Sequence, residues 1–188
     1  MRLAIAVVSL LVSGCATTTP PQTQAEFFEA ITVRSDIHDN SRTVVGYSFR
    51  DFNLYDEDAD WFMRSIQVGS NTIHQAYVRV SYKSDWAYYY RASSYGRELE
   101  FTSISRDVVS CYTSPCTLSE SFSASIPQDM MEEGALEGIQ IRFYARDGYR
   151  RDVSFPADYV RAQLEATNQV VPEREPSSEK VPAVVSAY

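Results

Sequence analysis

The chain has 188 residues, of which 44% are hydrophobic, and its 25 acidic and 17 basic side chains give a formal net charge of −8 at pH 7. This length and composition suit a single domain with a hydrophobic core. The acidic balance argues against nucleic acid as a partner, because nucleic-acid binding needs a basic surface. It equally argues against adhesion to anionic lipid headgroups through charge.

The first residues have the organisation of an export signal. Arg2 supplies a positive charge, residues 3–12 are apolar except for Ser9, and the small residues Val-Ser-Gly lead into Cys15. The apolar run is shorter than the roughly 20 residues that a membrane-spanning helix needs. Val12 to Cys15 resembles the lipobox of bacterial lipoproteins. The alternative is an ordinary signal peptide with an incidental cysteine, but no A-x-A-like cleavage site is present.

The resemblance implies what happens at Cys15. In bacterial lipoproteins the preceding segment is removed, the cysteine thiol takes a diacylglycerol, and the new amine takes a fatty acid such as palmitate. Ala16 stands where an Asp would favour retention in the inner membrane. The resemblance therefore implies that residues 1–14 are a signal peptide. It also implies that the lipid on Cys15 anchors the protein in the outer membrane, on the periplasmic side.

Composition divides the rest of the chain. Residues 15–25 are small, polar and proline-bearing, which predicts a flexible tether. Residues 169–188 carry Pro, Glu and Ser, which predicts a disordered tail. Residues 26–168 remain as a single β-rich domain.

Period-two alternation of apolar and polar residues dominates this domain, which predicts short strands. We expect about seven to nine antiparallel strands that form a β-sandwich, with a β-barrel as the alternative. Pro156 to Asn168 is expected to form a closing helix over an open end, and Pro127 to Glu133 one or two helical turns stopped by Gly134. The expected strands lie near residues 31–37, 43–49, 61–68, 76–82, 86–90, 99–101, 118–126, 139–144 and 149–155.

Cys111 and Cys116 flank a turn-forming Tyr-Thr-Ser-Pro segment. In an exported protein such a pair predicts a disulfide, which contributes about 2 kcal/mol for so short a loop. The alternative is a metal or redox site, but the C-x-x-C spacing of redox sites is absent.

Two clusters have residue types that bind metals. Asp56, Asp58 and Asp60 have the alternate spacing of a calcium loop, but the glycine and glutamate that complete an EF-hand are missing. We interpret them as a solvated loop. Asp36, His38 and Asp39 could form a zinc site with His74, but turn hydrogen bonds explain them equally well. The sequence therefore predicts neither a metal nor another cofactor.

Three further features stand out. Glu120 shares parity with the inward residues of its strand, so a buried carboxylate there needs a partner or a raised pKa. We expect either an arginine partner or a strand end that emerges into solvent, with a general acid as the alternative. Residues 86–90 and Tyr95 form an aromatic stretch that suits either the core or a sugar ring. The arginines of residues 142–151 are expected to pair with surface carboxylates; they are Arg142, Arg146, Arg150 and Arg151.

Catalytic motifs such as G-x-S-x-G, H-E-x-x-H and a phosphate-binding glycine loop do not occur in the sequence. A loose pattern resembles a family of small proteobacterial lipoproteins of unknown function. It covers Ala76 to Leu164 and includes residues 86–90, Ala92-Ser93, Gly96, residues 106–108, Ser110-Cys111, Cys116 and Ser119-Glu120. The resemblance implies the disulfide and places Glu120 in its neighbourhood.

The sequence therefore indicates an uncharacterised, non-enzymatic binding or scaffolding module of the cell envelope, with an envelope protein or a glycan as partner. The alternative is an envelope hydrolase that acts on glycan or peptidoglycan through a pair of carboxylates.

Overall fold

The structure is a computed structural model that describes residues 19–53, 57–112, 114–146 and 148–169. The expected signal peptide, Cys15 and most of the expected tail lie outside these residues. The expected tether is described only from residue 19, and helix α1 (Gln24–Glu29) begins within its last two residues. Thr23 and Glu26 form a capping box at the start of α1, which satisfies two backbone N–H groups there.

The described part of the chain forms two antiparallel sheets. The larger has seven strands in the order β1-β2-β4-β5-β9-β8, and β3 follows β2 along the same edge of β4. The alternating residues Ala76, Val78 and Val80 of β5 are fully buried, as their pattern predicts. The strands are β1 (Thr32–Asp36), β2 (Ser41–Val45), β3 (Phe49–Asn53), β4 (Glu57–Val68), β5 (Asn71–Lys83), β8 (Phe101–Ser110) and β9 (Thr117–Ile126).

The smaller sheet has four strands in the order β11-β10-β6-β7. Its strands are β6 (Tyr89–Ser94), β7 (Arg97–Leu99), β10 (Ile139–Ala145) and β11 (Arg150–Phe155). The chain passes from β7 straight into β8 through Glu100, whose carbonyl accepts a 2.9 Å hydrogen bond from the N–H of Ser125. One extended segment therefore bends from the smaller sheet into the larger one.

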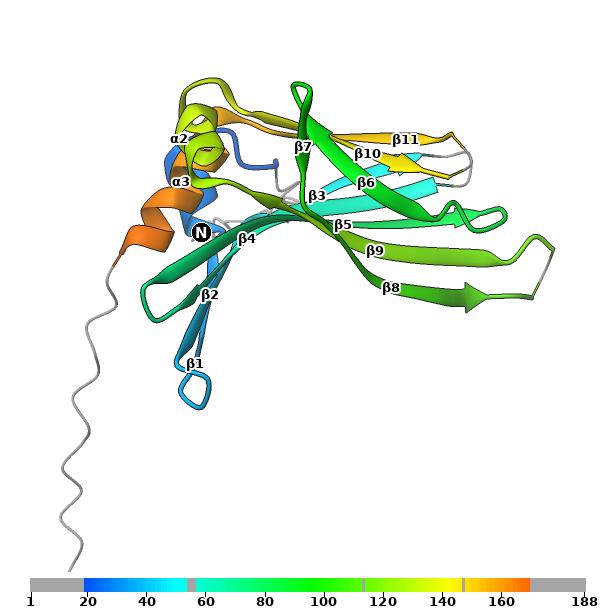
Figure 1. Ribbon diagram of the computed structural model, residues 1–188, viewed down its shortest axis with the longest axis horizontal. Coiled ribbons are helices and arrows are strands. Elements are labelled where there is room, and N and C mark those ends of the chain that lie inside the picture. Colours follow the sequence, from blue (N-terminus) through cyan, green and yellow to red (C-terminus); the bar gives the residue numbers. More distant parts are fainter. Residues whose placement is uncertain (1–18, 54–56, 113, 147, 170–188) are drawn as a thin grey trace, which may run out of the picture.

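The two sheets pack face to face as a β-sandwich (Figure 1). Tyr89 of β6 stacks on Phe122 of β9 with 4.4 Å between ring centroids, and Phe143 of β10 lies 4.9 Å from Phe122. The outermost strands β1 and β11 do not pair with each other in the described part of the chain, so the sheets do not close into a barrel. The predicted sandwich is confirmed, and the barrel is not formed.

The three helices of the described residues gather at one end of the sandwich (Figure 1). Besides α1 they are α2 (Gln128–Glu137) and α3 (Ala157–Asn168), and α3 contacts both other helices and strands β2 and β4. The predicted closing helix is confirmed, with Tyr159 and Val160 buried on its inner side. None of the described helices is long and apolar enough to cross a membrane.

Tyr159 fills a gap in the larger sheet. Between β2 and β3 the N–H of Gly46 still donates to the carbonyl of Met63 at 2.9 Å, but the N–H of Met63 donates to the Tyr159 hydroxyl at 2.8 Å instead of to the neighbouring backbone. That hydroxyl donates in turn to the carbonyl of Tyr47 at 3.1 Å. A Cβ at Gly46 would collide with the same hydroxyl, so the glycine permits this close approach.

The structure corrects the expected elements in three places. The described residues contain eleven strands rather than seven to nine, because Gly46 separates β2 from β3 and the expected strand at residues 99–101 is divided at Glu100 between β7 and β8. Helix α2 continues through Gly134 and ends at Gly138, whose φ of 85° suits glycine. At Gly134 a side chain would collide with Ile139, so this glycine allows close packing rather than ending the helix.

Candidate functional site

Glu120 is the only buried carboxylate among the described residues, with 1% of its surface exposed. It lies on β9 opposite Val80 of β5 and Arg106 of β8, on the inner face that the alternation predicts. Removing a carboxylate from water is costly unless hydrogen bonds replace the lost solvation. The surroundings of Glu120 therefore decide whether this residue has a structural role or a role in proton transfer.

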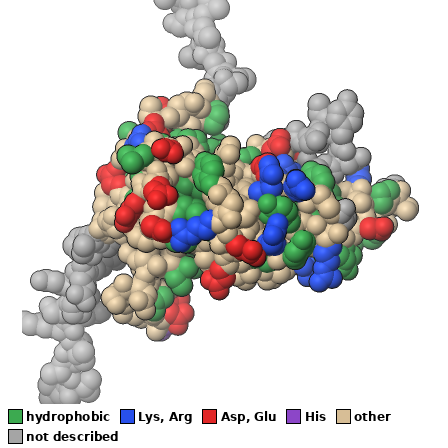
Figure 2. Space-filling view, turned by 45° about the horizontal axis from the view of Figure 1, so that its top comes forward, with side chains coloured by type: hydrophobic (Ala, Val, Ile, Leu, Met, Phe, Trp, Pro, Cys, Tyr) green, Lys and Arg blue, Asp and Glu red, His purple; other side chains and the backbone are tan. Residues whose placement is uncertain are grey.

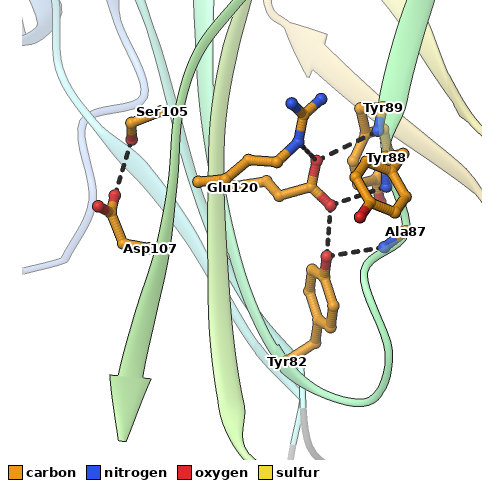
Figure 3. A network of polar contacts seen from close by, with 8 residues as sticks. Tyr82, Ala87, Tyr88, Tyr89, Ser105, Asp107 and Glu120 are labelled. Carbon is orange, nitrogen blue, oxygen red and sulfur yellow. Dashed lines mark hydrogen bonds and ion pairs between the residues drawn. The ribbon is translucent and has the colours of Figure 1, made fainter.

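Four donors converge on the Glu120 carboxylate (Figure 3). The Nε of Arg106 lies 3.0 Å from Oε2, and the Tyr82 hydroxyl donates to Oε1. The backbone N–H groups of Tyr88 and Tyr89 donate at 2.9 and 3.3 Å. The expected arginine pair is confirmed, and it is one part of a complete set of bonds.

These bonds shape the chain that leads into β6. The Tyr82 hydroxyl also accepts from the N–H of Ala87 at 3.0 Å, so three consecutive N–H groups point at Tyr82 and Glu120. Tyr88 has a φ of 54°, a left-handed conformation that costs a tyrosine about 1–2 kcal/mol. Successive N–H groups around such a residue form a concavity for an anion, and here Glu120 is that anion.

The resulting turn presents the Tyr88 ring, which is 40% exposed, to two arginines. The guanidinium carbon of Arg106 lies 5.1 Å from the ring centroid, and that of Arg146 lies 5.7 Å from it. Both distances are within the range of cation–π attraction. Arg146 is further fixed by a 2.9 Å hydrogen bond from its N–H to the carbonyl of Ala87.

A second tyrosine with two arginines lies on the outer face of the smaller sheet. Tyr144 of β10 is paired with Arg91 of β6 on one side and Arg150 of β11 on the other. Their guanidinium carbons lie 4.0 and 5.9 Å from the Tyr144 centroid. A hydrogen bond with Ser93 and the positive charges of Arg91, Arg142 and Arg150 lower the pKa of Tyr144.

We call these seven residues the arginine–tyrosine surface: Tyr88, Tyr144, Arg91, Arg106, Arg142, Arg146 and Arg150. Figure 2 shows basic side chains mainly over the right-hand half of this side of the molecule, whereas acidic ones gather over the helical, left-hand half.

The expected pairing of arginines with carboxylates is only partly right. Arg142 binds Asp152 through two hydrogen bonds of 2.6 and 2.7 Å, and Arg151 lies 3.3 Å from Asp51. Arg146 and Arg150, together with Arg91, have no carboxylate partner among the described residues and contact tyrosine rings instead. Three arginines of this surface thus make no close ion pair with a carboxylate of the described residues, although the hydrogen bonds from Arg142 and then the charge of Arg150 lower the pKa of Asp152.

The aromatic stretch divides between core and surface. Tyr89 is buried, while Tyr88, Tyr90 and Tyr95 are 40%, 51% and 77% exposed. Strict alternation along β6 would place Tyr89 and Arg91 on the same face, but Tyr89 is buried and Arg91 is not. The pairing of β6 with β10 shifts between Tyr144 and Ala145, so Tyr90 is an extra residue and Arg91 turns outward.

The two histidines lie in different environments. His38 is exposed in the turn between β1 and β2, where its N–H and that of Asp39 donate to Asp36 at 2.9 and 3.4 Å, so the predicted turn bonds are present. His74 is buried on β5. Its Nε2 donates to Gln128 at 3.0 Å, and its Nδ1 accepts from Ser65 at 2.8 Å.

The acidic run is not a loop over its described part. Asp58 and Asp60 belong to β4, where Asp60 pairs with Arg50 of β3 and Arg79 of β5 in the strand register. Asp56 lies outside the described residues. Among those that are described, no three His, Cys, Asp or Glu side chains are grouped so as to hold a metal ion.

The predicted disulfide is present between Cys111 and Cys116, with 4.3 Å between their Cα atoms. It closes the tip of the β8–β9 hairpin, and the same hairpin carries the Arg106–Glu120 pair. Tyr112, within the closed loop, is 97% exposed.

The sequence did not identify Arg91 and Tyr144 as surface residues of interest, nor did it predict that Arg106 contacts the exposed Tyr88 ring. The outward parity of Tyr144 is readable from the alternation of β10, but its neighbours depend on which strands pair. Comparisons with protein-family models, curated proteins and solved structures found no match to this chain. The resemblance to small proteobacterial lipoproteins therefore stays a prediction.

Proposed function

We propose that this protein is a lipid-anchored module of the cell envelope that binds a partner through the arginine–tyrosine surface and catalyses no reaction. The observation that carries the proposal is the set of three arginines, Arg91, Arg146 and Arg150, that contact exposed or half-exposed tyrosines without a described carboxylate partner. Arg and Tyr are enriched at binding interfaces because they offer large contact areas with polar ends.

The environment of Glu120 supports binding over catalysis. A general acid must reach its substrate, and its carboxyl group must be free to exchange a proton. Glu120 is 1% exposed, and its oxygens accept from Arg106, Tyr82 and two backbone N–H groups. This buried carboxylate therefore gives no support to the alternative of a hydrolase with a carboxylate pair.

The anchor part of the proposal rests on Cys15. Each buried methylene of an acyl chain contributes about 0.8 kcal/mol, so several chains on one residue would make release from the membrane negligible. Labelling cells with a clickable fatty acid tests this part. We expect label in the unaltered protein and none in Cys15→Ser, and label in Cys15→Ser would disprove the anchor.

Photo-crosslinking in cells tests the binding part. A photoreactive amino acid replaces either Tyr90 of β6 or Ile73 of β5, since both residues are 51% exposed. We expect capture of an envelope protein or glycan from position 90 and little capture from position 73. Equal yields from the two positions, or none from either, would contradict the proposal.

A further inference from the structure

A groove with a volume of about 250 Å³ lies on the outer face of the smaller sheet, next to the Tyr95 turn. Two tyrosines and four polar side chains line it, and they are Tyr95, Tyr144, Ser93, Gln140, Arg142 and Asp152. The groove is smaller and more polar than most drug-sized pockets, and it offers aromatic rings beside hydrogen-bonding groups. Its residues come from three strands and the β6–β7 turn.

Tyr95 provides a flat, accessible ring beside the groove. It is 77% exposed and has a φ of 46°, in a two-residue turn with Gly96 at 85°. A turn with both central residues at positive φ favours Asn-Gly or Asp-Gly, so a tyrosine there is strained. Tyr88, at the other end of β6, is the second exposed tyrosine with positive φ. The strain at Tyr88 belongs to the turn that binds Glu120, whereas the strain at exposed Tyr95 points to a function for its ring.

The lining of the groove carries one positive and one negative side chain, Arg142 and Asp152, and further arginines lie beside it. Arg142 uses its Nε and one terminal nitrogen to bind Asp152, and its other terminal nitrogen makes no hydrogen bond within the described residues. Arg91 and Arg150 flank Tyr144 and add two positive charges, neither of them in a close ion pair with a carboxylate of the described residues, and Arg150 also acts on Asp152. A guanidinium with free N–H groups binds a carboxylate through short, charge-assisted hydrogen bonds.

We infer that this groove binds a saccharide unit that carries a carboxylate. The apolar face of a sugar ring packs on the Tyr95 ring, the carboxylate approaches Arg142, and Ser93, Gln140 and Asp152 are hydrogen-bonding partners for hydroxyl groups. The inference rests on the proposed function, because it names the partner of the same surface. It commits to a glycan, since the glycerol or ethanolamine headgroup of a common phospholipid offers no ring face to Tyr95.

Calorimetric titration of the full-length protein in detergent tests the inference. The probes are the disaccharide of N-acetylglucosamine and N-acetylmuramic acid, which carries a carboxylate, and diacetylchitobiose, its neutral counterpart. We expect the neutral disaccharide to bind about tenfold more weakly or worse, since it lacks the charge-assisted bond. Equal affinity for both probes would overturn the inference.

Substitutions locate the site. Tyr95→Asn removes the ring while giving the turn its favoured Asn-Gly sequence, so it should lower the affinity about tenfold without unfolding the protein. Tyr112→Asn is the matched control at an exposed position outside the groove, and it should leave the affinity unchanged. Arg142→Gln should remove the preference for the charged disaccharide. Unchanged binding in Tyr95→Asn would overturn the inference.

Titration with a soluble anionic lipid, dihexanoylphosphatidylglycerol, distinguishes a glycan ligand from a membrane lipid. Binding of this lipid in preference to the charged disaccharide would overturn the inference. If neither disaccharide binds but position 90 still captures an envelope protein in cells, the inference fails and the proposed binding function stands.

Discussion

Arg106 and Glu120 form an ion pair that joins the surface of the protein to its interior. The Nε of Arg106 lies 3.0 Å from Oε2 of Glu120, and 36% of the arginine side chain is exposed against 2% of the glutamate. The same arginine lies over Tyr88, whose N–H donates to Glu120. The buried carboxylate therefore holds an exposed ring and an exposed cation in one arrangement.

Glu120→Gln should destabilise the fold by about 2–4 kcal/mol, because an amide NH2 group would face donors and Arg106 would lose its partner. Chemical denaturation measures the change. Glu98→Gln on the exposed strand β7 is the control and should stay within about 0.5 kcal/mol of the unaltered protein. If both variants have the same stability, Glu120 does not hold the start of β6.

Tyr159→Phe should cost about 1–3 kcal/mol, because the buried N–H of Met63 and the carbonyl of Tyr47 would both lose their partner. Burial raises the pKa of the Tyr159 hydroxyl, so it remains a neutral donor at all physiological pH values. Thermal unfolding measures the change, with the exposed Tyr112→Phe as the control. Identical melting temperatures for the two variants would show that Tyr159 does not replace the missing backbone bond.

The stability of the protein should decrease as the pH falls below about 6.5, the pKa of an unperturbed histidine. Desolvation lowers the pKa of buried His74, although its bond with Gln128 opposes this. The unfolded chain therefore takes up a proton at a pH where the folded chain does not, which favours unfolding.

His74→Gln should remove this part of the pH dependence, and His38→Gln, at an exposed turn, should not. Denaturation curves between about pH 5 and 7.5 measure both, a range around the ordinary histidine pKa. The same pH dependence in all three proteins would assign the effect to other groups.

Tyr95→Asn should stabilise the protein by about 1 kcal/mol, because asparagine tolerates a positive φ that strains tyrosine. Tyr90→Asn is the control within β6 and should not stabilise, since asparagine is disfavoured in strands. A Tyr95→Asn variant less stable than the unaltered protein would mean that the Tyr95 ring has a structural role.

The sequence predicts the sandwich because the alternation of apolar and polar residues along a strand depends only on which side chains are buried. Ala76, Val78 and Val80 share one face, and so do Ile139, Ile141 and Phe143, as the structure confirms. The closing helix is equally predictable from its proline start and its apolar side. These features require no knowledge of which strands are neighbours.

The errors occur where a tertiary contact overrides the local pattern. Gly134 continues a helix because Ile139 packs against it, and Gly46 interrupts a strand because Tyr159 approaches it. Tyr90 is an extra residue in β6, so the residues after it face the side opposite to the one that strict alternation predicts. The arginine–tyrosine surface is missed for a related reason, since Arg91, Tyr144 and Arg150 meet only once β10 lies between β6 and β11.

The central claim is that the arginine–tyrosine surface binds an envelope partner. The most direct measurement is the crosslinking yield from position 90 in a triple variant, Arg91→Gln, Arg146→Gln and Arg150→Gln, which removes the arginines without described carboxylate partners. We predict that the yield falls to the level of position 73 while the melting temperature is maintained. An unchanged yield from the folded triple variant would contradict the claim.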